Sequence, residues 1–187
     1  MPFHTTPFAG VILFEPAVYP DERGFFFESY NKKLFEANHL HLDFVQDNQS
    51  QSSYGVIRGL HYQRTPWAQT KLVRAISGRI LDVMVDLRQG SPTFGKSFSV
   101  ELSAENKMQV LIPQGFAHGF SVLSETAELS YKCDNFYNKA SESGIRFDDP
   151  VLQIDWQIPS GKELISAKDM LLPAFDPGLR DFIYKPA

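Results

Sequence analysis

The stretch Pro-Gln-Gly-Phe-Ala-His-Gly at residues 113–119 does most to decide the fold. Its proline and glycine signal a turn, and the apolar run that follows, with His118 inside it, is typical of a short strand. The stretch Arg-Gly-Leu-His-Tyr-Gln at residues 58–63 has the same character and places His61 near a glycine. Two glycine-framed histidines at strand ends therefore indicate a β-rich domain, and they are the first candidates for its functional site.

Strand signals recur at short intervals on both sides of these stretches. They lie at residues 44–45, 55–57, 71–76, 80–87, 98–102, 109–112, 119–123 and 127–132. Turn signals rich in glycine, proline and serine separate several of them. Many short strands with regular turns predict an antiparallel sandwich or barrel of the jelly-roll type, so the expected fold class is mainly β with a few short helices.

The two ends of the chain carry weaker signals. Residues 10–16 and 25–30 are predicted as strands on either side of a charged turn, and Asn31 is predicted to cap a short helix. After about residue 150, four prolines disfavour long elements, and one or two short helices packed on the barrel are expected there. Nothing indicates a second domain, so residues 1–187 are expected to form a single domain.

The composition describes an ordered globular protein and argues against several classes of function. The 187 residues are 43% hydrophobic and include 16 phenylalanines, enough to bury a substantial core. The net charge of −4, without a basic run, argues against a nucleic-acid partner. No apolar stretch is long enough to span a membrane, and no secretory signal is visible. A cytoplasmic location is expected, and the single cysteine, Cys133, fits a reducing compartment and a place in the core.

Strand periodicity leaves two questions open. Alternation puts Asp82 and Asp86 on one face of their strand, and that face is equally compatible with solvent and with the barrel lumen. Strict alternation also puts Arg58 and His61 on opposite faces of theirs. A bulge at Gly59 would re-aim one of these two side chains.

Lys71 and Tyr131 complete a set of side chains suited to moving protons. Each lies on a predicted strand, in the same domain as His61 and His118. Histidine, with an ordinary pKa of about 6.5, suits a general base, whereas tyrosine, near 10, stays protonated and can donate. Any one of these side chains alone is more simply explained by packing in the barrel wall. Together they indicate proton transfer next to a carbonyl group.

The two histidine stretches resemble the motifs of the cupin superfamily, a β-barrel fold. Residues 113–118 match the second motif, and residues 59–61 stand where the first is expected. Metal-binding cupins usually carry His-x-His followed by a glutamate, whereas here Gln63 replaces the second histidine. Two histidines are fewer ligands than a catalytic metal site usually provides, so a pocket with no metal and no cofactor is expected. A metal-dependent cupin enzyme with His61, Gln63 and His118 as ligands is the alternative.

A closer resemblance covers nearly the whole chain, in order. The matching runs lie at residues 21–28, 44–48, 58–61, 71–74, 82–88, 103–107, 112–120, 123–128, 131–133, 148–150 and 166–169. They resemble the dTDP-4-dehydrorhamnose 3,5-epimerase family, which consists of metal-free cupin barrels. The resemblance implies an isomerase that converts dTDP-4-dehydro-6-deoxy-D-glucose to dTDP-4-dehydro-L-rhamnose, in dTDP-L-rhamnose biosynthesis, by inverting C3 and C5.

This resemblance assigns four catalytic residues. His61 is expected to be the general base that removes a proton next to the C4 ketone, with Asp169 hydrogen-bonded to its ring. Lys71 is expected to stabilise the enolate oxygen, and Tyr131 is expected to return a proton from the opposite face. Inversion needs groups on both faces of the sugar ring, so a base and a separate acid are a chemical requirement.

The same resemblance assigns a larger set of residues to the nucleotide sugar. By position these are Arg23, Glu28, Gln46, Asn48, Arg58, His118, Tyr137, Glu142 and Lys168. Arginine suits the diphosphate because its planar fork matches phosphate oxygens. Tyr137, or Phe136 beside it, is expected to stack on the thymine. Arg23 and Glu28 are expected to come from a partner subunit, in a homodimer that exchanges N-terminal strands and has residues 1–50 at its interface.

The catalytic set leaves other activities open. An epimerase that acts on C3 or C5 alone, or a ketoisomerase of a related nucleotide sugar, would use much the same side chains. A sugar-nucleotide binding protein without catalysis is a further alternative, although the complete set of acid, base and cation argues against it.

Overall fold

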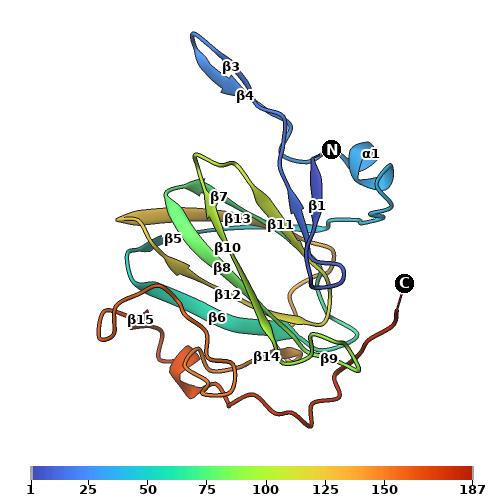
Figure 1. Ribbon diagram of the computed structural model, residues 1–187, viewed down its shortest axis with the longest axis vertical. Coiled ribbons are helices and arrows are strands. Elements are labelled where there is room, and N and C mark those ends of the chain that lie inside the picture. Colours follow the sequence, from blue (N-terminus) through green and yellow to red (C-terminus); the bar gives the residue numbers. More distant parts are fainter. Residues whose placement is uncertain (1, 187) are drawn as a thin grey trace.

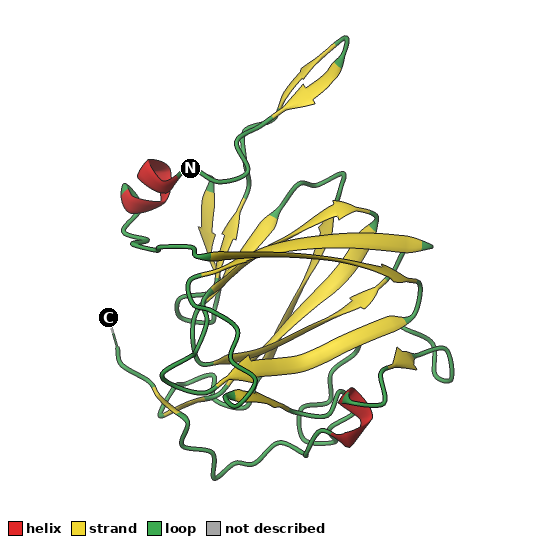
Figure 2. Ribbon diagram, turned by 180° about the vertical axis from the view of Figure 1, so that it is seen from behind, coloured by secondary structure: helices red, strands yellow, loops and turns green. Residues whose placement is uncertain are grey.

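The computed structural model describes residues 2–186, which form a barrel of two facing β-sheets (Figure 1). The first sheet has the order β1 (Phe3–Thr5), β2 (Ile12–Phe14), β11 (Gln109–Ile112), β7 (Lys71–Ser77), β13 (Thr126–Cys133) and β5 (Gln46–Ser53). The second has the order β10 (Ser97–Ser103), β8 (Arg79–Asp86), β12 (Phe116–Val122), β6 (Val56–Gln63) and β14 (Glu142–Gly144), with β15 (Leu164–Ile165) parallel to β6. Seen from behind, the two sheets face each other across the barrel (Figure 2). The prediction of a mainly β, cupin-type jelly roll is confirmed.

The remaining elements are short and lie outside the two sheets. They are the hairpin of β3 (Tyr19–Asp21) and β4 (Gly24–Phe26), helix α1 (Lys32–Glu36), β9 (Arg88–Gln89), the 3₁₀ helix η1 (Asp169–Leu171) and β16 (Phe182–Ile183). The hairpin projects well away from the barrel (Figure 1). Among residues 2–186, no helix has the length and apolar character that crossing a membrane requires.

The N-terminal elements agree with the sequence in part. The helix cap is confirmed, because the Asn31 side chain accepts a hydrogen bond from the Leu34 amide. The strand predicted for residues 25–30 ends at Phe26, because Tyr30 packs edge-on against the buried ring of Phe35 in α1. The strand predicted from residue 44 begins instead at Gln46. Of the one or two helices expected after residue 150, the structure shows η1 alone within the described part of that segment.

A second apolar layer covers the outer face of β8. Leu81, Val83 and Val85 pack there with Trp156 and Phe175 of the C-terminal segment, while the opposite face of β8 lines the barrel interior. Both faces of the strand are therefore buried. The two aspartates of β8 therefore do not face solvent, which was one of the two positions that the sequence left open.

The two aspartates are fully buried and hydrogen-bonded. Asp82 lies on the interior face and contacts the His118 ring, whereas Asp86 closes the end of the strand. Asp86 accepts hydrogen bonds from Arg88, Ser91 and Thr93. Burial acts to raise the pKa of Asp86, but these hydrogen bonds outweigh it and hold the pKa below its usual value.

Candidate functional site

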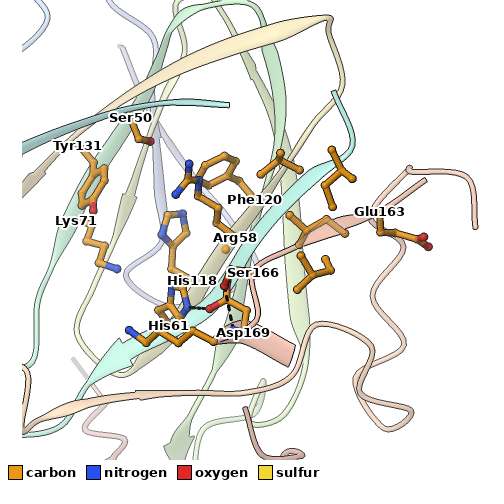
Figure 3. Close-up of a pocket in the computed structure, with 16 residues that line it drawn as sticks. Ser50, Arg58, His61, Lys71, His118, Phe120, Tyr131, Glu163, Ser166 and Asp169 are labelled. Atoms are coloured by element: carbon orange, nitrogen blue, oxygen red, sulfur yellow. Dashed lines mark hydrogen bonds and ion pairs between the residues drawn. The ribbon is translucent and has the colours of Figure 1, made fainter. Parts of the chain in front are cut away.

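A cavity of about 700 Å³ opens between the two sheets (Figure 3). Its walls come from five strands, β5, β6, β7, β12 and β13, and from residues 163–169 of the C-terminal segment. The lining residues are Ser50, Val56, Ile57, Arg58, His61, Lys71, His118, Gly119, Phe120, Tyr131, Glu163, Leu164, Ile165, Ser166, Lys168 and Asp169. The four predicted catalytic side chains therefore share one cavity, which is large enough for part of a nucleotide sugar.

A bulge in β6 brings Arg58 and His61 to the same wall. His61 pairs with His118 and Arg58 pairs with Phe120, so β6 contains one more residue than β12 between these two pairs. Gly59 lies in the bulge with φ 124°, and a Cβ there would lie 2.5 Å from the Cα of the facing strand's glycine. The bulge that the sequence suggested at Gly59 is thus present. It explains why Arg58 and His61 lie on the same face, although strict alternation would put them on opposite faces.

His61 and Asp169 form a tight pair at the floor of the cavity. The His61 Nε2 lies 2.7 Å from Asp169 Oδ1, and the Asp169 side chain is only 5% exposed. The Gly59 amide also donates to this carboxylate, and Ser166 Oγ accepts from the Asp169 amide, which fixes the start of η1. Burial acts to raise the pKa of Asp169, but the hydrogen bonds from His61 and Gly59 outweigh it and keep the carboxyl ionised. The pair therefore orients the ring with Nε2 toward the carboxylate and leaves Nδ1 for other chemistry.

Lys71 and Tyr131 stand together on the opposite sheet. They occupy neighbouring strands, β7 and β13, and the Lys71 Nζ lies 5.8 Å from the Tyr131 ring centroid. Burial lowers the pKa of Lys71 and raises that of Tyr131. Among residues 2–186, Lys71 forms no ion pair within 4 Å, so its charge is available to a ligand.

A second histidine–aspartate pair lies deeper in the barrel. His118 Nε2 is 2.8 Å from Asp82 Oδ2, and both side chains are buried. Asp82 Oδ1 has no hydrogen-bond partner among the described residues. The carboxylate orients the His118 ring as Asp169 orients His61, and the sequence alone did not single out Asp82 for this task.

Three of the expected substrate-binding residues form a chain at the cavity rim. Glu142 Oε2 accepts a hydrogen bond from the Tyr137 hydroxyl at 3.0 Å, and its Oε1 pairs with Lys168 Nζ at 2.7 Å. The bond to Glu142 raises the pKa of Tyr137. Tyr137 and Phe136 are both more than half exposed, so either ring can be reached by a planar ligand.

Four other expected substrate-binding residues lie outside the cavity. Gln46 and Asn48 sit on β5 and hydrogen-bond to each other at 3.0 Å, and Gln46 also accepts from the Tyr137 amide. Arg23 lies at the tip of the projecting hairpin and pairs with Asp21, and Glu28 follows the hairpin. A single copy of the chain therefore does not bring Arg23 or Glu28 to the cavity.

The residues expected of a metal-dependent cupin do not converge on a metal site. The Gln63 amide is fully engaged with backbone: it donates to Trp67 and Phe136 and accepts from Asn138. Within residues 2–186, no group of three or more histidine, cysteine or acidic side chains has the geometry to hold a metal. His61, Gln63 and His118 are therefore not arranged as the three ligands that a metal-dependent cupin enzyme would need.

Several lining residues were not anticipated from the sequence. Phe120 closes the inner wall directly after the second histidine motif, and Ser50 lies across from it on β5. The wall made by residues 163–165 comes from the proline-containing segment just before the matching run at residues 166–169, and no sequence signal pointed to these three residues. The parallel pairing of β15 with β6 holds these residues at the cavity.

Comparison with known proteins agrees with this geometry. The family model for dTDP-4-dehydrorhamnose 3,5-epimerase matches residues 5–176. This chain belongs to that family. A dTDP-4-dehydrorhamnose 3,5-epimerase from Pseudomonas aeruginosa is 56% identical over 166 residues, which cover 88% of this chain and 91% of the relative.

Solved structures of the family superpose closely on the barrel. The dTDP-4-dehydrorhamnose 3,5-epimerase from Elizabethkingia anophelis is 56% identical, with a TM-score of 0.88 over 92% of this chain and 95% of its own. A dTDP-6-deoxy-D-glucose-3,5-epimerase from Legionella pneumophila, solved with dTDP-4-keto-L-rhamnose, is 45% identical, with a TM-score of 0.85 over 93% and 98%.

Proposed function

We propose that this epimerase-family chain converts dTDP-4-dehydro-6-deoxy-D-glucose to dTDP-4-dehydro-L-rhamnose by inverting C3 and C5, as a step of dTDP-L-rhamnose biosynthesis. The observation that carries the proposal is the shared cavity, in which a carboxylate-held imidazole faces an ammonium and a phenol on the opposite sheet. The family relationship supplies the substrate class.

The reaction begins with removal of the C3 proton by His61. Asp169 holds the ring through Nε2, so the unprotonated Nδ1 takes the proton and the carboxylate stabilises the imidazolium that forms. The electron pair of the C–H bond moves toward C4 and places negative charge on the C4 oxygen. Lys71 and His118 receive that charge, because both line the cavity and Lys71 has no ion-pair partner among the described residues.

The second half-step returns a proton from the other face of the ring. Tyr131 stands on the sheet opposite His61, so a sugar held between the sheets presents its two faces to the two groups. Tyr131 donates its phenolic proton to C3, the C4 ketone reforms, and the configuration at C3 is inverted. The His61 imidazolium then releases the proton it took to solvent, and the Tyr131 phenolate takes one up from solvent. C5, the other carbon next to the ketone, undergoes the same sequence.

The nucleotide would lie along the rim. Arg58, whose Nε donates to Ser52 Oγ at 3.0 Å, presents its guanidinium edge to the diphosphate, and Lys168 adds a second cation. Tyr137 would stack on the thymine. Gln46 would help to position Tyr137, because its side-chain oxygen accepts a hydrogen bond from the Tyr137 backbone amide. His118, Glu142 and Asn48 complete the expected contacts.

We further propose that residues 1–187 form a single domain that works as a homodimer with exchanged N-terminal segments. The projecting hairpin supports this arrangement, because Phe25 and Phe26 are 58% and 67% exposed although both are large apolar side chains. The partner's hairpin would bring Arg23 and Glu28 to the cavity, with residues 1–50 at the interface. A cytoplasmic location fits the buried free thiol of Cys133.

Proton exchange in D₂O tests the activity directly. The protein is incubated with dTDP-4-keto-6-deoxyglucose, and the C3 and C5 protons are followed by NMR. We expect deuterium at both carbons. Deuterium at neither carbon would reject the proposal, and exchange at one carbon only would show a single-site epimerase.

Complementation between inactive variants tests the exchanged dimer. Arg23→Ala and His61→Ala proteins, each inactive alone, are mixed under conditions that exchange protomers. If Arg23 acts in the partner's site, half of the dimers are mixed and one of their two sites is intact, so about a quarter of the wild-type activity returns. Mixtures that stay inactive would show that Arg23 does not act across the dimer.

A further inference from the structure

The last residues of the chain form a strap across one end of the barrel. At this end β6 finishes and β7 and β12 begin. Residues 177–186 lie beyond the part matched by the family model, which stops at residue 176. The strap runs past β9, where β16 pairs with it in parallel and the Tyr184 amide donates to the Gln89 carbonyl (Figure 1).

Side chains on both sides of β16 anchor the strap. Asp181 accepts a hydrogen bond from the Tyr62 hydroxyl and one from Arg64 Nε, each at 3.1 Å. On the other side, the Arg88 guanidinium lies 5.2 Å from the Tyr184 ring. These contacts tie the strap to strands that also build the cavity.

Phe182 is the residue of the strap that points into the barrel. Its side chain is buried, its ring lies 6.0 Å from that of Tyr62, and its Cγ is 3.4 Å from where a Cβ on Gly115 would be. The next residue, Ile183, is 62% exposed and points away. Because side chains alternate along a strand, Phe182 points inward and Ile183 points outward, and Phe182 alone of the two fills the end of the barrel.

A small chamber lies between Phe182 and the substrate cavity. Its volume is about 10 Å³, and its lining residues are Tyr62, Gln63, Gln69, Lys71, Ile112, Gly115, Phe116, His118 and Phe182. This space holds one water molecule at most. Lys71 and His118 line both the chamber and the substrate cavity, so Phe182 stands directly behind the two groups that face the C4 oxygen.

We propose that Phe182 is a positioning residue that seals the barrel end and keeps bulk water from the back of Lys71 and His118. The inference rests on the proposed function, because it assigns a task toward the enolate oxygen. A cation that water cannot reach interacts more strongly with developing negative charge, since the local dielectric constant is low. Loss of the Phe182 side chain would admit water. That water would screen the Lys71 ammonium, and the Lys71 side chain would be less firmly held.

The partial burial of Lys71 agrees with this role. Burial is the dominant influence on Lys71 and lowers its pKa, whereas the charges of Cys133, Asp82 and Glu142 act in the opposite direction. Lys71 is half-buried and faces the substrate cavity on one side, and Phe182 closes the space behind it at this end of the barrel.

Substitutions at adjacent positions of the strap test the proposal. Phe182→Ala opens the chamber, Phe182→Leu refills most of it, and Ile183→Ala is the matched control on the same strand. Turnover of dTDP-4-keto-6-deoxyglucose and the melting temperature are measured for each. We expect Phe182→Ala to lower kcat about tenfold with KM within twofold, Phe182→Leu to recover most of kcat, and Ile183→Ala to match wild type.

The outcomes separate this inference from the proposed function. A wild-type protein without turnover would reject the function itself. An active wild type together with a folded Phe182→Ala protein of unchanged kcat, or one altered only in KM, would overturn the role of Phe182. If Phe182→Ala does not fold, Phe182→Val and Asp181→Asn give smaller openings: a graded fall in kcat supports this role of Phe182, and full activity in both overturns it.

Discussion

The His61–Asp169 pair allows the sharpest prediction, the effect of Asp169→Asn. The substitution keeps the shape of the side chain and removes its charge. Two unit charges about 4 Å apart attract by about 4 kcal/mol at an effective dielectric constant of 20. The His61 side chain is 32% exposed, so solvent screening reduces this to about 3 kcal/mol. The charge exists on His61 only after proton removal, so we expect kcat to fall about 10²-fold.

The assay is the exchange of C3 and C5 protons in D₂O, followed by NMR under substrate saturation. KM should stay within twofold, because the buried carboxylate acts through His61 and not on the ground-state sugar. Asp155→Asn serves as the control, since Asp155 is exposed and only caps the Gln157 amide. A loss below fivefold in Asp169→Asn, or an equal loss in the control, would refute the reasoning.

The remaining predictions concern other parts of the barrel. Lys71→Met should lower kcat by about 10²- to 10³-fold, since it removes the cation facing the enolate oxygen; steady-state kinetics that show only a raised KM would contradict this. Tyr131→Phe should slow epimerisation more than deuterium exchange of the substrate, and equal losses would count against its role as the acid. Gly59→Ala should lower the melting temperature, because its Cβ would lie 2.5 Å from a backbone carbon; an unchanged melting curve would contradict the bulge. Asp86 has a lowered pKa in the folded state, so its contribution to stability is present above pH about 4 and is lost as the pH falls further; Asp86→Asn should be less stable at neutral pH and lose less on acidification, by urea unfolding.

The sequence could predict what depends on neighbouring residues. Turn signals and apolar runs place most strands, and Asn31 marks the start of α1 because a cap acts within one turn. His61, Lys71 and Tyr131 could be selected because each lies on a strand that the pattern identifies. Gly59 could be suspected as a bulge because a strict alternation failed there.

What the sequence could not supply depends on contacts between distant segments. The burial of Asp82 follows from strands and a C-terminal layer that cover β8 on both faces, which no local pattern encodes. The wall at residues 163–165 is held at the cavity by the pairing of β15 with β6, two strands far apart in the sequence. In the exchanged dimer proposed above, Arg23 reaches the cavity from a second copy of the chain, and no local pattern encodes such a contact.

The mixed construction of the cavity wall has a consequence for how such a protein can diversify. His61, Lys71 and Tyr131 stand on strands locked by ladder hydrogen bonds, whereas one side of the pocket is coil around Glu163 and Lys168. Replacements in coil reshape what a sugar meets at small cost to the scaffold. Substitutions in this short stretch can therefore change which sugar is preferred, while the strand residues proposed to move protons stay in place.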